Sequence, residues 1–472
     1  MNTNDSKPAV ITQSGYRIHY KELSQQIKCC YKKYECADRG LILLVCDNSY
    51  ENLVIYLSCL RYKIPVILLG EQDAEMVGKL LAAFPIAYLW TPDKHHGLSE
   101  MTPMGEYGKY TLFRNPDENV WRIPVSNEVA LLLPTSGSEG RSKLVMLSYE
   151  NIAHNTQSII KALDIHSEDR AALMLPLCYS YGLSVVHTHL AAGGVLLLPD
   201  SPIISPEFWK FLEREKVTSL SGVPSGYELM RKLRILEGRY QFGHLRILTQ
   251  AGGALRTDTQ EYVLDRLSKI NKSIHFAIMY GQTEATARMT TFYLDEHREK
   301  LGSVGRVIPG GKLWIEGDES TGEIYYEGNN VFLGYAETAG DIEKAAHNAD
   351  KVLCTGDVGY LDSDGYLYVS GRKKRFAKVN GYRLGLDKLQ AELSQQLGCE
   401  VVCVSVWIKE KEYVVVCLTD ISVDESIVEK LLTGNRKLAG SYLLKTIEAF
   451  PYKENGKIDY GLLQKTCIMQ ER

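Results

Sequence analysis

Short apolar runs alternate along most of the chain with longer segments in which apolar residues recur at helical spacing. The short runs predict buried strands, and the longer segments predict amphipathic helices. Alternating strands and helices are typical of parallel sheets joined by right-handed crossovers, so the pattern predicts a large α/β body. The predicted strands are Leu41–Cys46, Ile64–Leu69, Ile86–Trp90, Val129–Leu133, Leu144–Leu147, Ala171–Pro176, Gly194–Leu198, Thr218–Val223, Leu245–Thr249 and His275–Met279, and the predicted helices span 16–36, a segment ending at about Arg61, 74–84, 149–163 and 183–192.

The pattern changes at about residue 310, where shorter apolar runs are separated by turn residues. Such runs predict a β-rich subdomain that completes a large N-terminal core, residues 1–371. The basic stretch that follows predicts a hinge over 372–375, and a small mobile α+β C-terminal domain is expected over 376–472. Predicted strands in these parts are 312–316, 323–327, 352–355, 366–369, 400–408, 413–418 and 443–449, with helices near 387–397 and 424–433.

Composition excludes several classes of function. The 58 acidic and 54 basic residues nearly balance, so no surplus of positive charge recruits nucleic acid. The apolar runs are far shorter than the ~18 residues of a membrane span, and the polar N-terminus has no signal-peptide core. The scattered cysteines include no C-x-x-C pair, which favours reduced thiols. We therefore expect a cytoplasmic protein with no nucleic-acid partner and no membrane span.

A polar loop between the apolar runs Val129–Leu133 and Leu144–Leu147 contains the first candidate chemistry. Glycine lets the backbone approach a ligand closely, successive N–H groups converge, and hydroxyls add donors, which together suit an anion. The loop differs from the G-x-x-x-x-G-K-[ST] phosphate loop, because Arg141 and Ser142 follow Gly140 and a strand comes next. Taken alone, it is equally consistent with an ordinary β-hairpin turn.

A second candidate, Tyr280–Glu284, comes directly after the predicted strand His275–Met279. Ligands of open α/β sheets bind at the carboxyl ends of the strands. The Thr283 hydroxyl and the Glu284 carboxylate suit a phosphate and its Mg²⁺, which prefers oxygen ligands. The alternative is a turn that begins a helix, with Thr283 and Glu284 near its N-cap.

Two more stretches place charged residues near turns. Asp357 and Arg372 are separated by one predicted hairpin, so they suit a ribose diol and a phosphate, or form a structural salt bridge. Lys457 follows Gly456 in a loop near the C-terminus, where most lysines are simply solvated.

Together and in this order, these stretches resemble the adenylate-forming superfamily of acyl- and aryl-CoA synthetases, adenylation domains and beetle luciferases. The resemblance extends from about Tyr20 to Lys457. Further matches are Leu175–Gly182, Gly222–Pro224, Ala251–Ala254, Gly302–Arg306 with Pro309–Gly310, and Val331–Tyr335.

The resemblance implies that a substrate carboxylate attacks the α-phosphorus of ATP, with Mg²⁺ bound, to give an acyl-AMP and pyrophosphate. Lys457, Thr283 and Glu284 are then the catalytic residues, and Glu284 is also the metal ligand. The nucleotide would contact Thr135, Ser136, Gly137, Ser138, Gly140, Lys143, Ala251, Gly252, Gly253, Tyr280, Gly281, Gln282, Asp357 and Arg372.

The resemblance also implies an acyl pocket and a second step. In that step the small domain turns about Lys374 and brings another loop to the site, where a thiol attacks the acyl-AMP. The expected pocket residues are Tyr179, Gly222, Val223, Gly253 and Gly281, and the thiol-step residues are Lys378, Gly381 and Arg383.

No carrier segment follows Lys457, so CoA or a separate phosphopantetheinylated carrier protein is the expected acceptor. No acidic residue lies between Ala171 and Pro199 to pair with a substrate ammonium, which favours a fatty, short-chain or aryl acid. The alternatives are a stand-alone amino-acid adenylation protein and a catalytically weak ligand-binding homologue. The last is kept because Glu139 stands where the family motif has threonine.

Overall fold

The computed structural model describes residues 6–34, 40–92, 101–134, 143–271, 273–317, 321–346, 351–373, 375–380, 382–408, 411–419, 423, 425–434, 438, 440–453 and 456–469.

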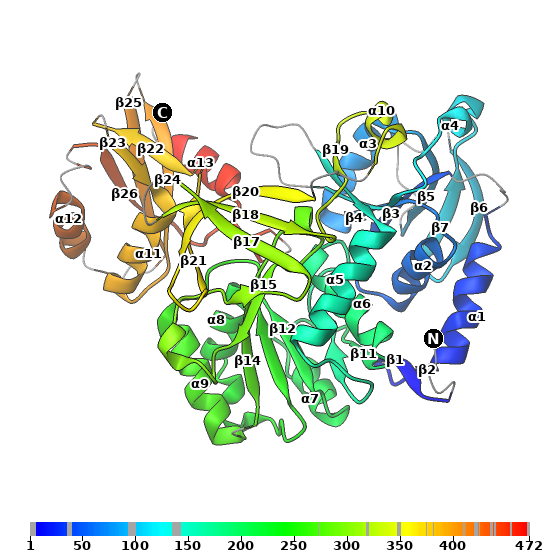
Figure 1. Ribbon diagram of the computed structural model, residues 1–472, viewed down its shortest axis with the longest axis horizontal. Helices are drawn as coiled ribbons and strands as arrows, with labels where there is room; N and C mark the ends of the chain where they lie inside the picture. The colour runs from blue at the N-terminus through cyan, green and yellow to red at the C-terminus, as the bar shows by residue number, and fades with distance from the viewer. Residues whose placement is uncertain are drawn as a thin grey trace.

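The larger sheet of the body has the strand order β16-β15-β14-β13-β12-β10-β11-β1-β2 (Figure 1). Strands β1 and β10 to β14 pair in parallel, as the alternating pattern predicts, and antiparallel strands close both edges. Its strands are β1 (Pro8–Thr12), β2 (Arg17–His19), β10 (Arg170–Ala172), β11 (Val195–Leu198), β12 (Ser219–Gly222), β13 (Ile247–Gln250), β14 (His275–Tyr280), β15 (Thr290–Tyr293) and β16 (Arg306–Val307).

A second sheet has the order β19-β9-β8-β4-β3-β5-β7-β6. Its centre is parallel, and β8 pairs antiparallel with β9 on either side of the loop predicted to bind an anion. The loop itself, residues 135–142, lies outside the described residues. The strands are β3 (Leu41–Cys46), β4 (Val66–Gly70), β5 (Ile86–Thr91), β6 (Thr102–Tyr107), β7 (Tyr110–Arg114), β8 (Val129–Pro134), β9 (Leu144–Ser148) and β19 (Gly334–Ala336).

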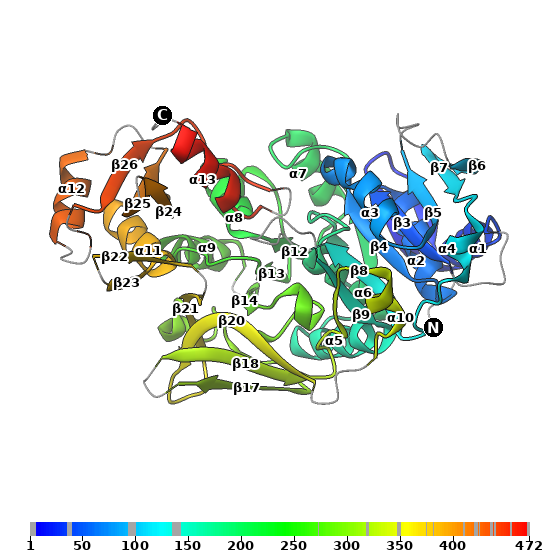
Figure 2. The ribbon, with the colours of Figure 1, turned by 90° about the horizontal axis from the view of Figure 1, so that it is seen from above.

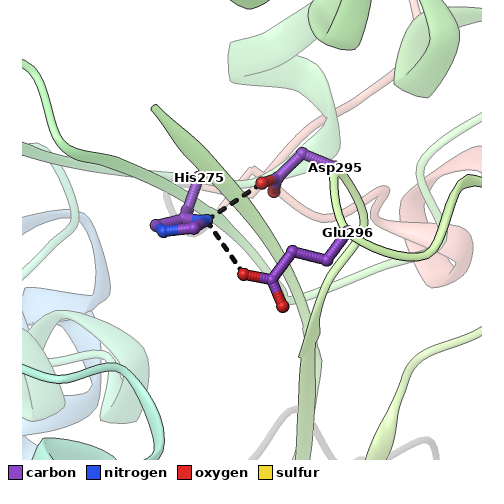
Figure 3. Close-up of side chains that lie close together, drawn as sticks. All are labelled: His275, Asp295 and Glu296. Atoms are coloured by element: carbon purple, nitrogen blue, oxygen red, sulfur yellow. Dashed lines mark hydrogen bonds and ion pairs between the residues drawn. The ribbon is translucent and has the colours of Figure 1, made fainter. Parts of the chain in front are cut away.

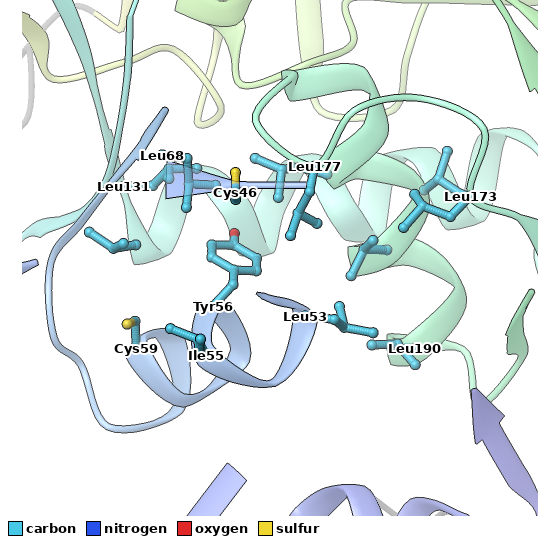
Figure 4. Packing of buried hydrophobic residues seen from close by; sticks show 14 of the residues in the cluster. Cys46, Leu53, Ile55, Tyr56, Cys59, Leu68, Leu131, Leu173, Leu177 and Leu190 are labelled. Carbon is cyan, nitrogen blue, oxygen red and sulfur yellow. The ribbon is translucent and has the colours of Figure 1, made fainter. Parts of the chain in front are cut away.

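One hydrophobic core joins the two sheets, with helices packed between them. Figure 4 shows part of it, where Tyr56 is surrounded by side chains such as Leu131 and Leu177. Each fully buried side chain of this kind contributes about 1.5–3 kcal/mol. The helices of this core are α1 (Tyr20–Tyr31), α2 (Tyr50–Arg61), α5 (Tyr149–Ala162) and α6 (Ser180–Ala191).

The outer faces of both sheets are covered by further helices. Ser205 caps the first of them and Pro206 occupies its first turn, a sequence that favours a sharp helix start. Helices α7 (Pro206–Arg214), α8 (Pro224–Lys232) and α9 (Thr257–Ile270) cover the larger sheet, α3 (Val77–Ala83) and α10 (Ala339–Glu343) cover the second, and α4 (Glu118–Arg122) and the short turns η1 (Glu71–Met76), η2 (Ile235–Arg239), η3 (Thr283–Ala285) and η4 (Arg298–Lys300) complete the body.

The β-rich part is an antiparallel sheet in the order β17-β18-β20-β21, and its register places Asp357 directly opposite Arg372. The last strands and helices gather beside it at one end of the molecule around two small cores of their own (Figures 1 and 2). These elements are β17 (Gly311–Glu316), β18 (Gly322–Gly328), β20 (Val352–Leu361), β21 (Leu367–Arg372), β22 (Phe376–Val379), β23 (Tyr382–Gly385), α11 (Leu386–Leu397), β24 (Val401–Ile408), β25 (Lys411–Leu418), α12 (Glu425–Gly434), β26 (Tyr442–Thr446) and α13 (Tyr460–Met469).

Several predicted boundaries were wrong. The predicted helix over 16–36 begins only at Tyr20, because Arg17–His19 pairs with β1 as an edge strand. The predicted strand Ala171–Pro176 ends at Ala172.

The sequence predicts neither a membrane span nor paired cysteines. Within the part that the structure describes, no helix is both long and apolar enough to cross a membrane. Every cysteine among the described residues is a free thiol, including the buried neighbours Cys417 and Cys467, whose sulfur atoms are 3.6 Å apart.

Candidate active site

The candidate site lies where three parallel strands of the larger sheet end. Strand β12 ends at Gly222, β13 ends at Gln250, and β14 ends at Tyr280. Since these strands are parallel neighbours, their carboxyl ends share one edge of the sheet. The segments expected to contact nucleotide and acyl group, which are Val223, Ala251, Gly252, Gly253, Gly281 and Gln282, directly follow these strand ends.

Tyr179, at the N-cap of α6, packs against Gly252. Gly252 has φ +88°, and a Cβ atom there would lie 2.8 Å from the Tyr179 hydroxyl oxygen and 3.0 Å from Val223 Cγ1. A side chain at this position would therefore push Tyr179 out of place. Burial raises the pKa of Tyr179 to about 12, so the phenol is neutral at physiological pH.

Asp357 connects the β-rich sheet to the strand ends. The Tyr280 hydroxyl donates a hydrogen bond of 2.5 Å to Asp357 Oδ2, and Arg372 Nε lies 3.3 Å from Asp357 Oδ1. Asp357 is 7% exposed whereas Arg372 is exposed. Burial raises the pKa of the Asp357 carboxyl, and the charge of Arg372 and the Tyr280 hydrogen bond oppose this rise. The structure thus brings together a buried carboxylate and an accessible guanidinium.

Thr283 and Glu284 form the short turn η3, immediately beyond β14. The Thr283 hydroxyl is 3.3 Å from that of Ser180, at the start of α6. Tyr335 donates a hydrogen bond of 2.8 Å from its hydroxyl to Glu284 Oε1. Lys143 lies on the other side of Tyr335, with its Nζ 5.8 Å from the ring centroid. Its ammonium also pairs with a carboxylate, that of Glu337, at 2.8 Å.

The loop that carries Lys457 docks on the body next to β12. A Cβ atom on Gly456 would lie 2.4 Å from Val223 Cγ2, so only glycine allows this close approach. The Ser225 hydroxyl donates a 3.3 Å hydrogen bond to the Gly456 carbonyl. The docked loop holds Lys457 Nζ 5.5 Å from the centroid of the Tyr179 ring.

Lys457 shares an electrostatic environment with residues from three other segments. Burial lowers the pKa of the Lys457 ammonium, and the positive charge of Arg372 lowers it further, while Asp357 and Glu284 raise it. The sequence-predicted residues Lys457, Arg372, Asp357 and Glu284 therefore converge on one site, although they lie far apart in the chain.

The lowered pKa of Lys457 predicts an alkaline limit to activity. If the ammonium is needed, kcat/KM should fall as the pH rises through this lowered pKa, that is, below the ordinary titration range of a lysine. A pH profile of kcat/KM tests this, because kcat/KM reports the ionisation of the free enzyme. For Lys457→Arg, the residual kcat/KM should not fall over this pH range, since a guanidinium stays charged throughout. A fall in kcat/KM at the same pH in both proteins would contradict the assignment of this fall to the Lys457 ammonium.

The structure leaves some predicted residues untested. Thr135, Ser136, Gly137, Ser138, Glu139, Gly140, Lys374 and Gly381 lie outside the described residues, as does the side chain of Arg383. Lys378 is described on β22, where its side chain is exposed and its backbone N–H donates to Glu412 of the small domain. Lys378 is thus held within the small domain in an arrangement where Lys457 lies over Tyr179.

Arg288, which the sequence did not single out, is a buried cation beside the site. It is 2% exposed, and its guanidinium carbon lies 4.6 Å from the centroid of the Tyr181 ring. Among the described residues no carboxylate pairs with it, and its Nε has no hydrogen-bond partner. A cation–π contact contributes about 2 kcal/mol when desolvated, whereas removing a guanidinium from water costs several kcal/mol. The cost of burying Arg288 is therefore not fully offset.

A cluster suited to a metal ion lies away from these residues. His275 Nδ1 lies 2.9 Å from Asp295 Oδ2 and 3.7 Å from Glu296 Oε1 (Figure 3). His275 begins β14, whereas the candidate site lies at the other end of that strand. Asp295 is already engaged, because its Oδ1 accepts the backbone N–H of Phe276 at 2.7 Å. The His275 and Asp295 side chains are thus joined by a hydrogen bond at the start of β14.

The chain is similar to known proteins in sequence and in fold. The family model described as "AMP-binding enzyme" matches residues 1–336. Sulfoacetate–CoA ligase of Cupriavidus necator is 30% identical over 58% of this chain and 53% of its own length. Oxalate–CoA ligase of Saccharomyces cerevisiae is 26% identical over 74% of this chain and 65% of its own length. The matched part of this chain thus spans between about half and two thirds of these curated relatives.

Solved structures show the same fold. o-Succinylbenzoate CoA synthetase from Bacillus subtilis, in complex with its acyl-adenylate intermediate, superposes with a TM-score of 0.76 at 20% identity, covering 98% of this chain and 96% of that one. ATP-bound MatB from Rhodopseudomonas palustris gives 0.74 at 22% identity, covering 98% and 96%.

Proposed function

Because the chain belongs to the AMP-binding enzyme family, we propose that it activates a small carboxylic acid with ATP and transfers the acyl group to a thiol. The carboxylate oxygen attacks the α-phosphorus, the bond to the β-phosphate breaks, and pyrophosphate leaves. The thiol then attacks the acyl carbon of the acyl-AMP, and AMP leaves with the oxygen that came from the acid. The observation that carries this proposal is that the Lys457 loop docks at the strand ends, over Tyr179, where Asp357 pairs with Arg372 and accepts a hydrogen bond from Tyr280.

The roles follow from the charges that develop. Positioning and charge neutralisation dominate phosphoryl transfer. Lys457, the only residue of this group on the small domain, would bridge the attacking carboxylate and the α-phosphate. Asp357 would accept hydrogen bonds from the ribose hydroxyls, and exposed Arg372 would face the nucleotide. Tyr179, neutral and held against Gly252, would form a wall of the acyl pocket with Val223.

The phosphate side of the site is supplied by η3 and the β8–β9 connection. The Thr283 hydroxyl would donate to the α-phosphate, and Lys143 with the loop 135–140 would hold the β- and γ-phosphates. The half-buried carboxylate of Glu284 accepts only one hydrogen bond in the described part of the chain, from Tyr335, so it fits as an oxygen ligand for Mg²⁺. When bound, Mg²⁺ supplies neutralisation of the phosphate charge.

The second step requires a different arrangement of the small domain. We propose that this domain turns about Lys374, which withdraws Lys457 and brings Lys378, Gly381 and Arg383 to the site. The exposed position of Lys378 in the present arrangement supports this alternation. CoA is the first acceptor to test, since the relatives named above are CoA ligases, and a phosphopantetheinylated carrier protein is the second.

An exchange assay tests this function. With ATP, Mg²⁺ and labelled pyrophosphate, we expect label to enter ATP only when the correct acid is present, since the first step is reversible. The panel should include short monocarboxylic acids, dicarboxylic acids, aryl acids, fatty acids and amino acids, followed by CoA and a carrier protein as acceptors. If none of the acids in the panel supports exchange, the proposal is contradicted.

A further inference from the structure

Resting on the proposed function, we propose that Arg288 makes this site selective for short acids that carry a second anionic group at the end away from the reacting carboxylate. A carboxylate or a sulfonate in that position would pair with the guanidinium. Arg288 is then a specificity residue, and Lys457 serves the reacting carboxylate.

The first argument is that Arg288 is a buried cation with no anionic partner among the described residues. Arg288 is 2% exposed, has no carboxylate partner among the residues described, and has an Nε without a hydrogen-bond partner. Buried charges in proteins are paired or bind a ligand. The ring of Tyr181 partly satisfies the guanidinium, but its hydroxyl is already bonded to Thr249 Oγ1 at 2.7 Å. An anionic ligand would supply the missing partner.

The second argument is the position of Arg288 relative to the reacting centre. The Arg288 guanidinium carbon lies 4.6 Å from the centroid of the Tyr181 ring, and that ring lies 6.3 Å from the ring of Tyr179. Lys457 Nζ lies 5.5 Å from the centroid of the Tyr179 ring. Arg288 and Lys457 are therefore connected through the adjacent rings of Tyr181 and Tyr179. An acid lying along Tyr179 can place its reacting carboxylate at Lys457 and a second anion at Arg288.

The third argument is the space beside Arg288. The guanidinium lines a small cavity of about 20 Å³, so only a compact group of a substrate, and not a long acyl chain, can lie against Arg288. Hydroxyl groups line part of the remaining wall, beside apolar side chains such as Ile159 and Met279. The hydroxyl groups belong to Tyr181, Ser184, Thr188, Ser219, Ser221 and Thr249.

Pairs of acids with equal chain length test the proposal. Pyrophosphate exchange should be measured with malonate, succinate and glutarate against propionate, butyrate and valerate. For at least one pair, kcat/KM should favour the dicarboxylate by about 30-fold or more in the natural protein. Arg288→Met, which keeps the length and removes the charge, should lower that ratio to near one, mainly through KM for the dicarboxylate.

Two further measurements separate binding from a structural role. Arg288→Met should melt at the same temperature as the natural protein or higher, because removing an unpaired buried charge relieves its desolvation. Arg239→Met is the matched control, since Arg239 also lies over a tyrosine ring, Tyr240, but on the exposed surface. This control should retain the preference for the dicarboxylate.

Each remaining outcome overturns the proposal. Exchange with monocarboxylates at rates equal to or above those of the dicarboxylates would remove the selectivity claim and leave the proposed function intact. A variant Arg288→Met that melts lower and retains the natural preference would show that Arg288 only stabilises the fold. If no acid at all supports exchange, the proposed function is overturned as well.

Discussion

Replacing Lys457 with methionine is expected to lower the rate of adenylate formation by about 10²–10³-fold, the usual loss when one donor to a transition-state charge is removed. Methionine keeps the length and packing of the side chain over Tyr179 but removes the ammonium. ATP should still bind, because the contacts proposed for its ribose and phosphates belong to other segments. Pyrophosphate exchange measures the rate, and calorimetric titration with ATP measures binding.

Lys453→Met is the matched control for this experiment. Lys453 lies in the same loop, and its backbone N–H, which the substitution keeps, donates to the Lys457 carbonyl at 2.8 Å. We expect exchange within about twofold of the natural rate in this control, since surface substitutions away from such contacts have small effects. Unchanged exchange in Lys457→Met, or an equal loss in both variants, would show that the ammonium of Lys457 does not act in the first step.

Asp357→Asn is expected to raise KM for ATP by about 10- to 100-fold. Hydrogen bonds to a charged group contribute about 1.5–3 kcal/mol, and each 1.4 kcal/mol is a factor of ten in affinity. The amide also turns an N–H group or a weaker acceptor toward the Tyr280 hydroxyl and toward Arg372, which now face the buried carboxylate. Steady-state kinetics with varied ATP measure the effect.

Deoxynucleotides identify the group that Asp357 recognises. The natural protein should use 2′-deoxy-ATP or 3′-deoxy-ATP less well than ATP, and Asp357→Asn should lose most of this discrimination. Asp362→Asn is the control, because Asp362 follows the same strand but pairs with Lys300 at 2.9 Å on the surface. Discrimination that persists in Asp357→Asn would place the ribose elsewhere.

The strands of the body could be predicted because central strands of a parallel sheet are buried on both faces. β3 is apolar and buried along its full length. Prediction failed where an element was too short to show a period. Arg17–His19 became a strand through its pairing with β1, a tertiary contact that no local pattern encodes.

The residues proposed to contact the nucleotide could be singled out from the sequence for a similar reason. Thr283 and Glu284 follow a strand, and Asp357 and Arg372 flank a hairpin, so local pattern alone suggested their neighbourhood. Arg288 was missed because its sequence context, a single charge among small residues after Glu284, has no period and no partner nearby. Only the three-dimensional structure shows that this charge is buried without a carboxylate.

Both the sequence and the structure of the proposed acyl pocket bear on the charge of the substrate. The absence of acidic residues between Ala171 and Pro199 argued against a substrate ammonium. The structure adds a cation, Arg288, to the same region, which argues for a substrate anion. The charges on the wall of the proposed acyl pocket therefore indicate the charge of the substrate, which family membership alone does not.

The central claim is that a carboxylate oxygen of the substrate attacks the α-phosphorus of ATP. The most direct test uses an acid labelled with oxygen-18 in its carboxyl group, together with ATP, Mg²⁺ and the acceptor thiol, and analyses the nucleotide product by mass spectrometry. We predict AMP that carries one labelled oxygen, since thiol attack breaks the bond between the acyl carbon and that oxygen. Unlabelled AMP, or ADP as the product, would contradict the account.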